Sequence, residues 1–169
     1  MRDEMPVVGG FEGAAPEVVV RPARTEDAVL IADLSASFVV SDKLVRRSLK
    51  ELNERIHELS VATRDGVLVG CMGLSRYPHG IVVYNFCIAP DAQGNGIGGL
   101  LVDHAARLGR RSGHRRLLAA SKYAGDWFIK RGFERILPEK IPDEWLKFLC
   151  PGRGSCLFQL ELLDQNSSD

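Results

Sequence analysis

A glycine-rich segment stands between a strand-like apolar run and an amphipathic, helix-like run. It reads Gln93-Gly94-Asn95-Gly96-Ile97-Gly98-Gly99 and follows a run that ends at Ala89-Pro90. Glycines allow successive backbone N–H groups to point into one concavity, and the N-terminus of the following helix adds a partial positive charge. Gly98 and Gly99, one turn into the helix, also allow a ligand or a neighbouring strand to approach closely. The segment is therefore suited to binding a pyrophosphate.

The spacing of the glycines shows which known phosphate-binding motif the segment matches. It is not the dinucleotide fingerprint GxGxxG, and it lacks the Lys-Ser/Thr pair of a P-loop. An isolated glycine cluster of this kind can also be a plain strand-to-helix turn. The run Gln93-x-x-Gly96-x-Gly98 has the spacing of the Q/R-x-x-G-x-G/A motif, so the segment resembles the acetyl-CoA pyrophosphate loop of GNAT acetyltransferases. That resemblance implies a cosubstrate site formed by Cys87, Ile88, Ala89, Gln93, Gly94, Asn95, Gly96, Ile97, Gly98 and Gly99.

Motifs on both sides of this loop resemble the acetyltransferase domain of N-acetylglutamate synthases. They span about Pro22 to Leu163 and comprise Leu44-Val45-Arg46-Arg47-Ser48, Asp65-Gly66 with Gly70-Cys71, Trp127-Phe128-x-x-Arg131-Gly132-Phe133, Leu137-Pro138 and Gly152-Arg153-Gly154-Ser155. In that family the α-amino group of L-glutamate attacks the thioester of acetyl-CoA. Many of its members carry an amino-acid-kinase domain as well, so a stand-alone short enzyme and one half of a larger assembly both remain open, as does a homodimer.

The resemblance implies that basic residues hold the carboxylates of the acceptor. The candidates are Arg46, Arg153 and Ser155, because a guanidinium offers two parallel charge-assisted bonds to a carboxylate and a hydroxyl can add a third. Arg46 could equally be a solvated helix charge, and Arg47 is expected to face away from the site. Two other functions stay open: acetylation of another amino acid, a polyamine or a protein N-terminus, and CoA binding without catalysis. The arginines favour an anionic acceptor over a polyamine.

The sequence alone does not identify a catalytic side chain. Many GNAT enzymes carry a tyrosine, the acid that protonates the leaving thiolate, where this chain has Phe128, and Ile81-Val82-Val83-Tyr84 replaces the Gly-Glu pair of the synthases. Tyr84 could place a polar tip in the site or be a half-buried strand residue. The resemblance implies that a backbone N–H within 86–89 stabilises the oxyanion, with Cys87 as a packing residue. Either His79 or a chain of water molecules could be the base.

Composition limits the remaining functions. Of the 169 residues, 22 are Lys or Arg and 22 are Asp or Glu, so no global field attracts nucleic acid or an anionic membrane. Neither a signal peptide nor an apolar run long enough to span a bilayer is present, and four cysteines do not form a disulfide scaffold in a chain of this size. We therefore expect a cytoplasmic protein. Cys150 and Cys156 lack a second pair of ligands, so no metal site is predicted.

The elements that would position these residues alternate along one domain, residues 18–163, between flexible tails at 1–17 and 164–169. Strands are predicted at 18–21, 60–64, 67–74, 81–89, 115–121, 133–137 and 157–163, and helices at 28–38, 45–59, 97–108 and 124–131, with a turn, a short helix and a loop in 138–154. A meander followed by strand–helix–strand–helix indicates the α/β (or α+β) class. The expected architecture is the GNAT fold, in which a mixed, mostly antiparallel central sheet carries helices on both faces.

Overall fold

A computed structural model describes residues 15–78, 80–148 and 153–163 of the chain. Most of both predicted tails, together with His79, Cys150 and Gly152, lies outside these described residues. The side chain of Lys147 is not described either.

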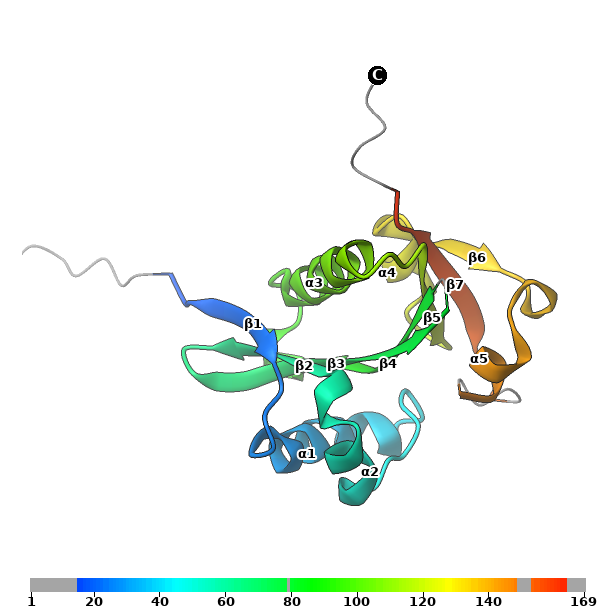
Figure 1. Cartoon of the computed structure of the whole chain (residues 1–169). Coiled ribbons are helices and arrows are strands. Elements are labelled where there is room, and N and C mark those ends of the chain that lie inside the picture. Colours follow the sequence, from blue (N-terminus) through cyan, green and yellow to red (C-terminus); the bar gives the residue numbers. More distant parts are fainter. Residues whose placement is uncertain (1–14, 79, 149–152, 164–169) are drawn as a thin grey trace, which may run out of the picture.

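A seven-stranded sheet forms the centre of the molecule (Figure 1). Its strand order is β1-β2-β3-β4-β5-β7-β6, and every neighbouring pair is antiparallel except β4 and β5. The strands are β1 (Val18–Pro22), β2 (Leu59–Arg64), β3 (Val67–Tyr77), β4 (Gly80–Ile88), β5 (Arg116–Ser121), β6 (Glu134–Ile136) and β7 (Cys156–Glu161). The predicted mixed, mostly antiparallel sheet is confirmed.

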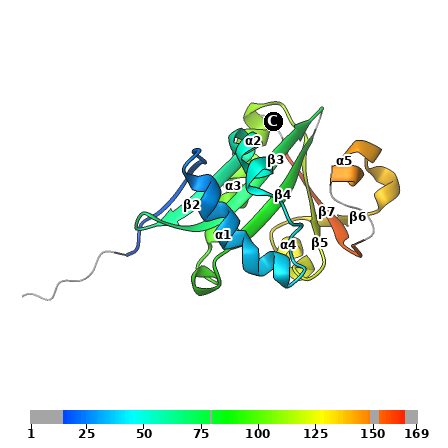
Figure 2. The ribbon, with the colours of Figure 1, turned by 90° about the horizontal axis from the view of Figure 1, so that it is seen from below.

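Helices cover both faces of this sheet, as expected (Figures 1 and 2). On one face lie α1 (Asp27–Val40) and α2 (Leu49–Glu54), and on the other lie α3 (Ile97–Arg111) and α4 (Gly125–Lys130). The short helix α5 (Asp143–Phe148) follows β6 and places Trp145 against Gly80 of β4. The single-turn helices η1 (Ile56–Glu58), η2 (Pro90–Ala92) and η3 (Pro138–Lys140) complete the connections.

The β2–β3 hairpin forms where the Asp-Gly pair predicts it. Asp65 and Gly66 have φ values of 49° and 80°, the left-handed conformations that a tight two-residue turn requires. The predicted helix over 45–59 is wrong in its length, because α2 begins at Leu49 and ends at Glu54. Ser48 caps α2 through a capping box with Glu51, so Val45 precedes the helix, and the apolar residues beyond it belong to η1 and the start of β2.

The start of α1 is held by an ion pair, and its N-cap residue, Glu26, makes no side-chain cap hydrogen bond. Asp27 is buried and accepts two hydrogen bonds from the guanidinium of Arg21, at 2.7 and 3.0 Å. It accepts a third from the backbone N–H of Arg24, at 2.7 Å. These bonds lower the pKa of the Asp27 carboxyl, the Arg21 bond most strongly, and they fasten α1 to β1.

Replacing Asp27 with Asn is expected to destabilise the fold by about 3 kcal/mol, because Arg21 then loses its anionic partner. The lowered pKa gives a stabilisation that is complete above the unfolded pKa, roughly 3.9, and is lost as pH falls through the folded value. Denaturant unfolding at neutral pH and near pH 3 measures both effects. Asp33→Asn, at an exposed position of the same helix, is the control and should change neither.

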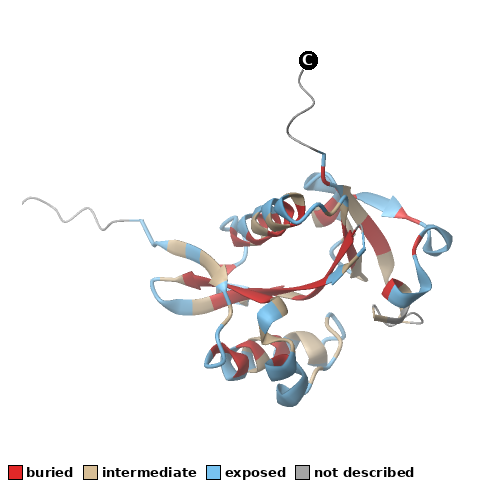
Figure 3. Cartoon of the chain, in the orientation of Figure 1, coloured by how far each residue is buried: buried red, intermediate tan, exposed pale blue. Residues whose placement is uncertain are grey.

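Three apolar clusters fill the space between the sheet and its helices, the third of them beside α5, so burial is concentrated along the central strands (Figure 3). The cluster under α3 includes Leu101, Leu117 and Phe128, and the one under α1 and α2 includes Ile31 and Tyr84. The ring of Tyr84 occupies the place where a Cβ at Gly73 would lie. A glycine in β3 therefore makes room for the aromatic ring of β4.

Candidate active site

The parallel strands β4 and β5 separate along their length. Their ladder runs from Gly80–Arg116 to Val82–Leu118, although β4 continues to Ile88 and β5 to Ser121. A cavity of about 540 Å³ lies in this opening, within the usual size range of small-molecule sites. Its lining comes from the loop after α1, the outer half of β4, the loop and first turn of α3, the end of β5, and α4.

A bulge in β4 shapes the floor of the cavity. The β3–β4 register changes from Cys71–Cys87 to Gly73–Tyr84, so Asn85 and Phe86 share a single opposite residue. Asn85 takes a left-handed φ of 47°, and its side chain donates to Ser35 at 3.0 Å. Beyond Val82 the ladder gives β4 no partner in β5, so backbone groups at this edge can interact with a ligand.

The glycine loop at one end of the cavity has the predicted character. Gly94 and Gly96 have φ values of 79° and 78°, and Gly96 is the N-cap of α3. The side chain of Gln93 donates to the carbonyl of Ile88 at 3.1 Å, and that of Asn95 donates to the carbonyl of Ala92 at 3.2 Å. Both polar side chains thus order the loop itself and leave the N–H groups at the start of α3 for an anion.

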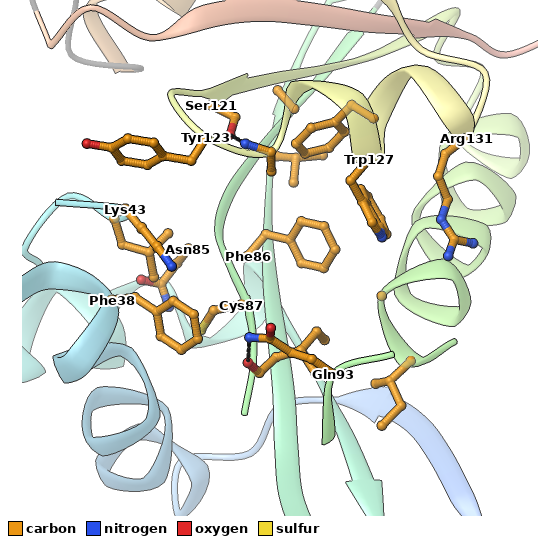
Figure 4. Close-up of a pocket in the computed structure, with 18 of the residues that line it drawn as sticks. Phe38, Lys43, Asn85, Phe86, Cys87, Gln93, Ser121, Tyr123, Trp127 and Arg131 are labelled. Carbon is orange, nitrogen blue, oxygen red and sulfur yellow. Dashed lines mark hydrogen bonds between the residues drawn. The ribbon is translucent and has the colours of Figure 1, made fainter. Parts of the chain in front are cut away.

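Gly98 and Gly99 make room for two side chains, Trp127 of α4 and Arg131 at its C-cap. A Cβ on Gly98 would lie 2.8 Å from the indole of Trp127, and one on Gly99 would overlap the guanidinium of Arg131. Arg131 itself lies over the Trp127 ring, 4.7 Å from its centroid, and lines the cavity (Figure 4). Among the described residues no carboxylate pairs with Arg131. A cation therefore lies beside the N-terminus of α3. Arg131 belongs to a motif quoted from the sequence, but it was not predicted to be a site residue.

Most of the predicted cosubstrate residues come together at this cavity. Those that line it are Cys87, Ile88, Gln93, Gly94, Gly96, Ile97 and Gly98, whereas Ala89, Asn95 and Gly99 do not. The spacing of the motif fixes which residues surround the turn. It cannot show which of them face inward, because that depends on β4 and α4.

The predicted acceptor residues lie elsewhere. Arg46 is exposed and lines a second cavity, of about 570 Å³, between α1 and α2. The two cavities share Asn85 as a lining residue. The expectation that Arg47 faces away is wrong, because its guanidinium lies 4.8 Å from the centroid of the Tyr84 ring and 5.4 Å from that of Phe148.

Arg153 does not line the first cavity. It lies at the rim, in the sense that it shares the Asp42 carboxylate with the lining residue Lys122. It donates to the carboxylate of Asp42 at 2.9 Å and to the carbonyl of Asp42 at 3.0 Å, and Lys122 also binds that carboxylate. Lys43 and Lys122 do line the cavity, Lys43 with no acidic partner within the described ranges. Ser155, two residues after Arg153, is half-buried and lines neither cavity. The lysines were not predicted, since no motif contains them.

The titratable side chains of β4 are held in neutral forms. Hydrogen bonding with Cys71, at an Sγ–Sγ distance of 3.6 Å, and burial raise the pKa of Cys87 far above its usual value. Burial, and then the bond that its hydroxyl donates to Glu58 at 2.5 Å, raise the pKa of Tyr84. The raised pKa of each group disfavours a nucleophilic or acid role for it at neutral pH.

Phe128 stacks on Phe158 in the core and offers no hydroxyl. Across the part of the chain that the structure describes, no group of three or more potential ligand side chains could hold a metal ion. Over the same residues, no helix is long and apolar enough to cross a membrane.

The splayed strands, the bulge in β4 and the glycine loop at the N-terminus of α3 together form the cavity. Sequence comparison identifies the class of domain to which they belong. Residues 55–135 match the Acetyltransferase (GNAT) domain family. The chain thus carries an acetyltransferase domain of the GNAT family, and it is similar to amino-acid acetyltransferases.

One such relative, the amino-acid acetyltransferase of Ralstonia nicotianae, is 32% identical over 145 residues, which are 85% of this chain and 32% of the relative. This chain spans about a third of the length of the curated relatives that it matches. The N-acetylglutamate synthase of Neisseria gonorrhoeae, solved with coenzyme A and N-acetyl-glutamate, superposes with a TM-score of 0.82 at 29% identity, over 88% of this chain and 36% of that one. Rv2747 from Mycobacterium tuberculosis shares the fold, with a TM-score of 0.75 at 24% identity, over 86% of this chain and 99% of that one.

Proposed function

We propose that the protein transfers the acetyl group of acetyl-CoA to the α-amino group of an amino acid, with L-glutamate as the acceptor. The observation that carries this proposal is the cavity between β4 and β5, which has the glycine loop and N-terminus of α3 at one end and Lys43 and Lys122 in its lining. Relatives named as amino-acid acetyltransferases, and the synthase solved with coenzyme A and N-acetyl-glutamate, support the same acceptor class.

Acetyl-CoA fits the cavity in one direction. Its pyrophosphate is expected at the start of α3, where the N–H groups that follow Gln93 meet the guanidinium of Arg131. The acetyl group then lies along the outer half of β4. There a backbone N–H of the segment 86–89 can donate to the thioester oxygen as negative charge develops on it. Phe86, Cys87 and Ile88 of this segment line the cavity, next to the bulge in β4.

The acceptor end of the cavity is cationic. Lys43 and Lys122 line it, and Arg153 reaches its rim, whereas no aspartate or glutamate among the described residues belongs to the lining. Such a lining attracts the carboxylates of an amino acid and disfavours a polyamine. The arrangement therefore supports an anionic acceptor, although the residues that supply the charge differ in part from those the motifs predict.

The proposed reaction is a direct attack. The neutral α-amine adds to the thioester carbonyl, the carbon–sulfur bond breaks, and CoA leaves as its thiol after proton transfer from the amine. Within the described residues no carboxylate or histidine lines the cavity, and His79 lies outside them. We propose that water relays this proton from the amine to the leaving sulfur. Hydrogen bonding with Cys71 and burial raise the pKa of Cys87, which supports a direct attack without an acyl-enzyme.

Turnover measurements with acetyl-CoA and a panel of free amino acids and polyamines test this function. Release of CoA thiol, followed with a chromogenic disulfide, should be fastest with L-glutamate and should yield N-acetyl-glutamate by mass spectrometry. Faster turnover of a neutral or cationic amine would replace the acceptor but keep the acyltransferase. Binding of CoA without turnover of any amine would indicate a non-catalytic CoA-binding domain instead.

Arg131→Ala is expected to weaken CoA binding by about tenfold, the loss of one charge-assisted contact. Binding of pantetheine, which lacks the pyrophosphate, should not change. Lys130→Ala, an exposed neighbour on α4 that does not line the cavity, is the matched control. Calorimetric titration of both ligands measures the effect. Equal losses for CoA and pantetheine would show that Arg131 only supports Trp127.

A further inference from the structure

Asp42 joins three distant segments of the chain at the rim of the cavity. Its carboxylate accepts hydrogen bonds from Lys122, which follows β5, and from Arg153, which precedes β7. These partners are 80 and 111 residues away in sequence. In Figure 4 Lys43, the residue after Asp42, lies on the same side of the cavity as Asn85. Asp42 thus precedes one lining residue, Lys43, and binds another, Lys122, at the end of the cavity proposed for the acceptor.

The contacts with Asp42 occupy Nη2 of Arg153, the nitrogen that matters most for binding a carboxylate. Nη2 of Arg153 donates to Oδ1 and to the carbonyl oxygen of Asp42, which uses both of its hydrogens. A carboxylate takes two parallel bonds either from Nη1 and Nη2 or from Nε and Nη2, so both binding edges include this nitrogen. An incoming carboxylate can form this paired contact with Arg153 only if it displaces Asp42.

Lys122 donates one of its three ammonium hydrogens to Oδ2 of Asp42. The side chain of Asp42 is 56% exposed, whereas those of Lys122 and Arg153 are 21% and 24% exposed. The carboxylate can thus turn into solvent while the two cations stay at the rim. Lys122 most strongly, and then Arg153, lower the pKa of the Asp42 carboxyl, so it competes with a full negative charge at neutral pH.

We propose that Asp42 is a specificity-determining residue, an internal carboxylate that competes with the side-chain carboxylate of the acceptor for Lys122 and Arg153. This inference rests on the proposed function, since it concerns the acceptor of that same site. An anionic amino acid exchanges one carboxylate for another at these cations. A neutral amino acid shares the α-carboxylate but has no side-chain carboxylate to exchange, so its binding does not depend on Asp42.

The opposite role would be purely structural. If Asp42 only held Lys122 and Arg153 in place for the acceptor, its removal would disorder them and weaken binding of anionic amino acids. The two roles therefore predict opposite changes in KM, which makes the sign of the change decisive.

Asp42→Asn and Asp42→Gly test the competition without straining the backbone. Asp42 has a φ of 58°, which asparagine and glycine tolerate better than alanine does. L-glutamate and L-glutamine are the probes, because they have nearly the same shape and differ in charge. We expect KM for L-glutamate to fall by about fivefold in Asp42→Asn, and by more in Asp42→Gly, since exposed ion pairs then cease to compete. KM for L-glutamine should not change.

Glu54→Gln is the control, because it removes one exposed carboxylate of α2 that pairs only loosely with Lys50. It should leave both KM values as they are. An unchanged or raised KM for L-glutamate in both Asp42 variants would overturn the inference and leave the proposed function standing. A wild-type protein that acetylates neither amino acid would overturn both.

Discussion

Gly96→Val is expected to weaken CoA binding by between about 10- and 100-fold. Gly96 is the N-cap of α3 and has a φ of 78°, which a β-branched residue adopts only at a cost of roughly 1 to 3 kcal/mol. A Cβ at this position would meet nothing within 4 Å, so no steric clash inside the protein contributes to the loss. The valine would instead turn the N–H groups of the loop away from the pyrophosphate. Calorimetric titration with CoA measures the change.

Gly113→Val is the matched control for backbone strain. Gly113 has a φ of 74°, a Cβ on it would likewise meet nothing within 4 Å, and it follows the opposite end of α3. It should lower the stability as much as Gly96→Val does and leave CoA affinity unchanged. Equal affinity for CoA in the two variants would remove the loop from the cosubstrate site.

Arg153→Ala is expected to raise KM for L-glutamate by about 10- to 100-fold and to leave KM for acetyl-CoA nearly unchanged. The loss of one charge-assisted contact between a guanidinium and a carboxylate is worth roughly 1.5 to 3 kcal/mol. Arg153→Lys should recover only part of the loss, because an ammonium cannot donate the two parallel bonds. Steady-state kinetics with each substrate varied in turn gives both constants.

Arg46→Ala is the informative comparison, because Arg46 is exposed on the second cavity. An equal rise in KM would extend the acceptor site across Asn85 into that cavity. Arg47 cannot serve as the inert control that the sequence suggested, since its guanidinium packs on Tyr84 and Phe148. Normal acetylation of L-glutamate by Arg153→Ala would refute the proposed role of Arg153.

Local signals predicted the fold well where they lie close together in sequence. The Asp65-Gly66 turn and the glycine loop before α3 each contain their own turn residues, so the elements beside them were correct. The helix over 45–59 failed because apolar spacing alone cannot separate a helix from the strand that follows it. The capping box of Ser48 and Glu51 was present in the sequence and would have set the true start of α2.

The candidate site was predictable only in its contiguous half. The cosubstrate loop is a single segment, whereas Lys43, Lys122 and Arg131 meet the cavity from segments far apart in the chain. Their positions depend on the separation of β4 from β5 and on the packing of α4 against α3, which no short motif encodes. One signal for Arg131 was available: two adjacent glycines in a helix allow bulky neighbours to approach closely, and Trp127 and Arg131 lie one helical turn apart.

The glycine beneath the Tyr84 ring links two positions of the sheet in evolution. Because that ring fills the space of a side chain at position 73, any larger residue there would force the aromatic ring out of place. Relatives with a small residue at position 84 should therefore accept alanine or valine at position 73, while those with an aromatic residue at 84 should keep glycine. The two positions are expected to covary across an alignment of the family, and such an alignment would trace which lineages share this packing of an aromatic ring on a glycine.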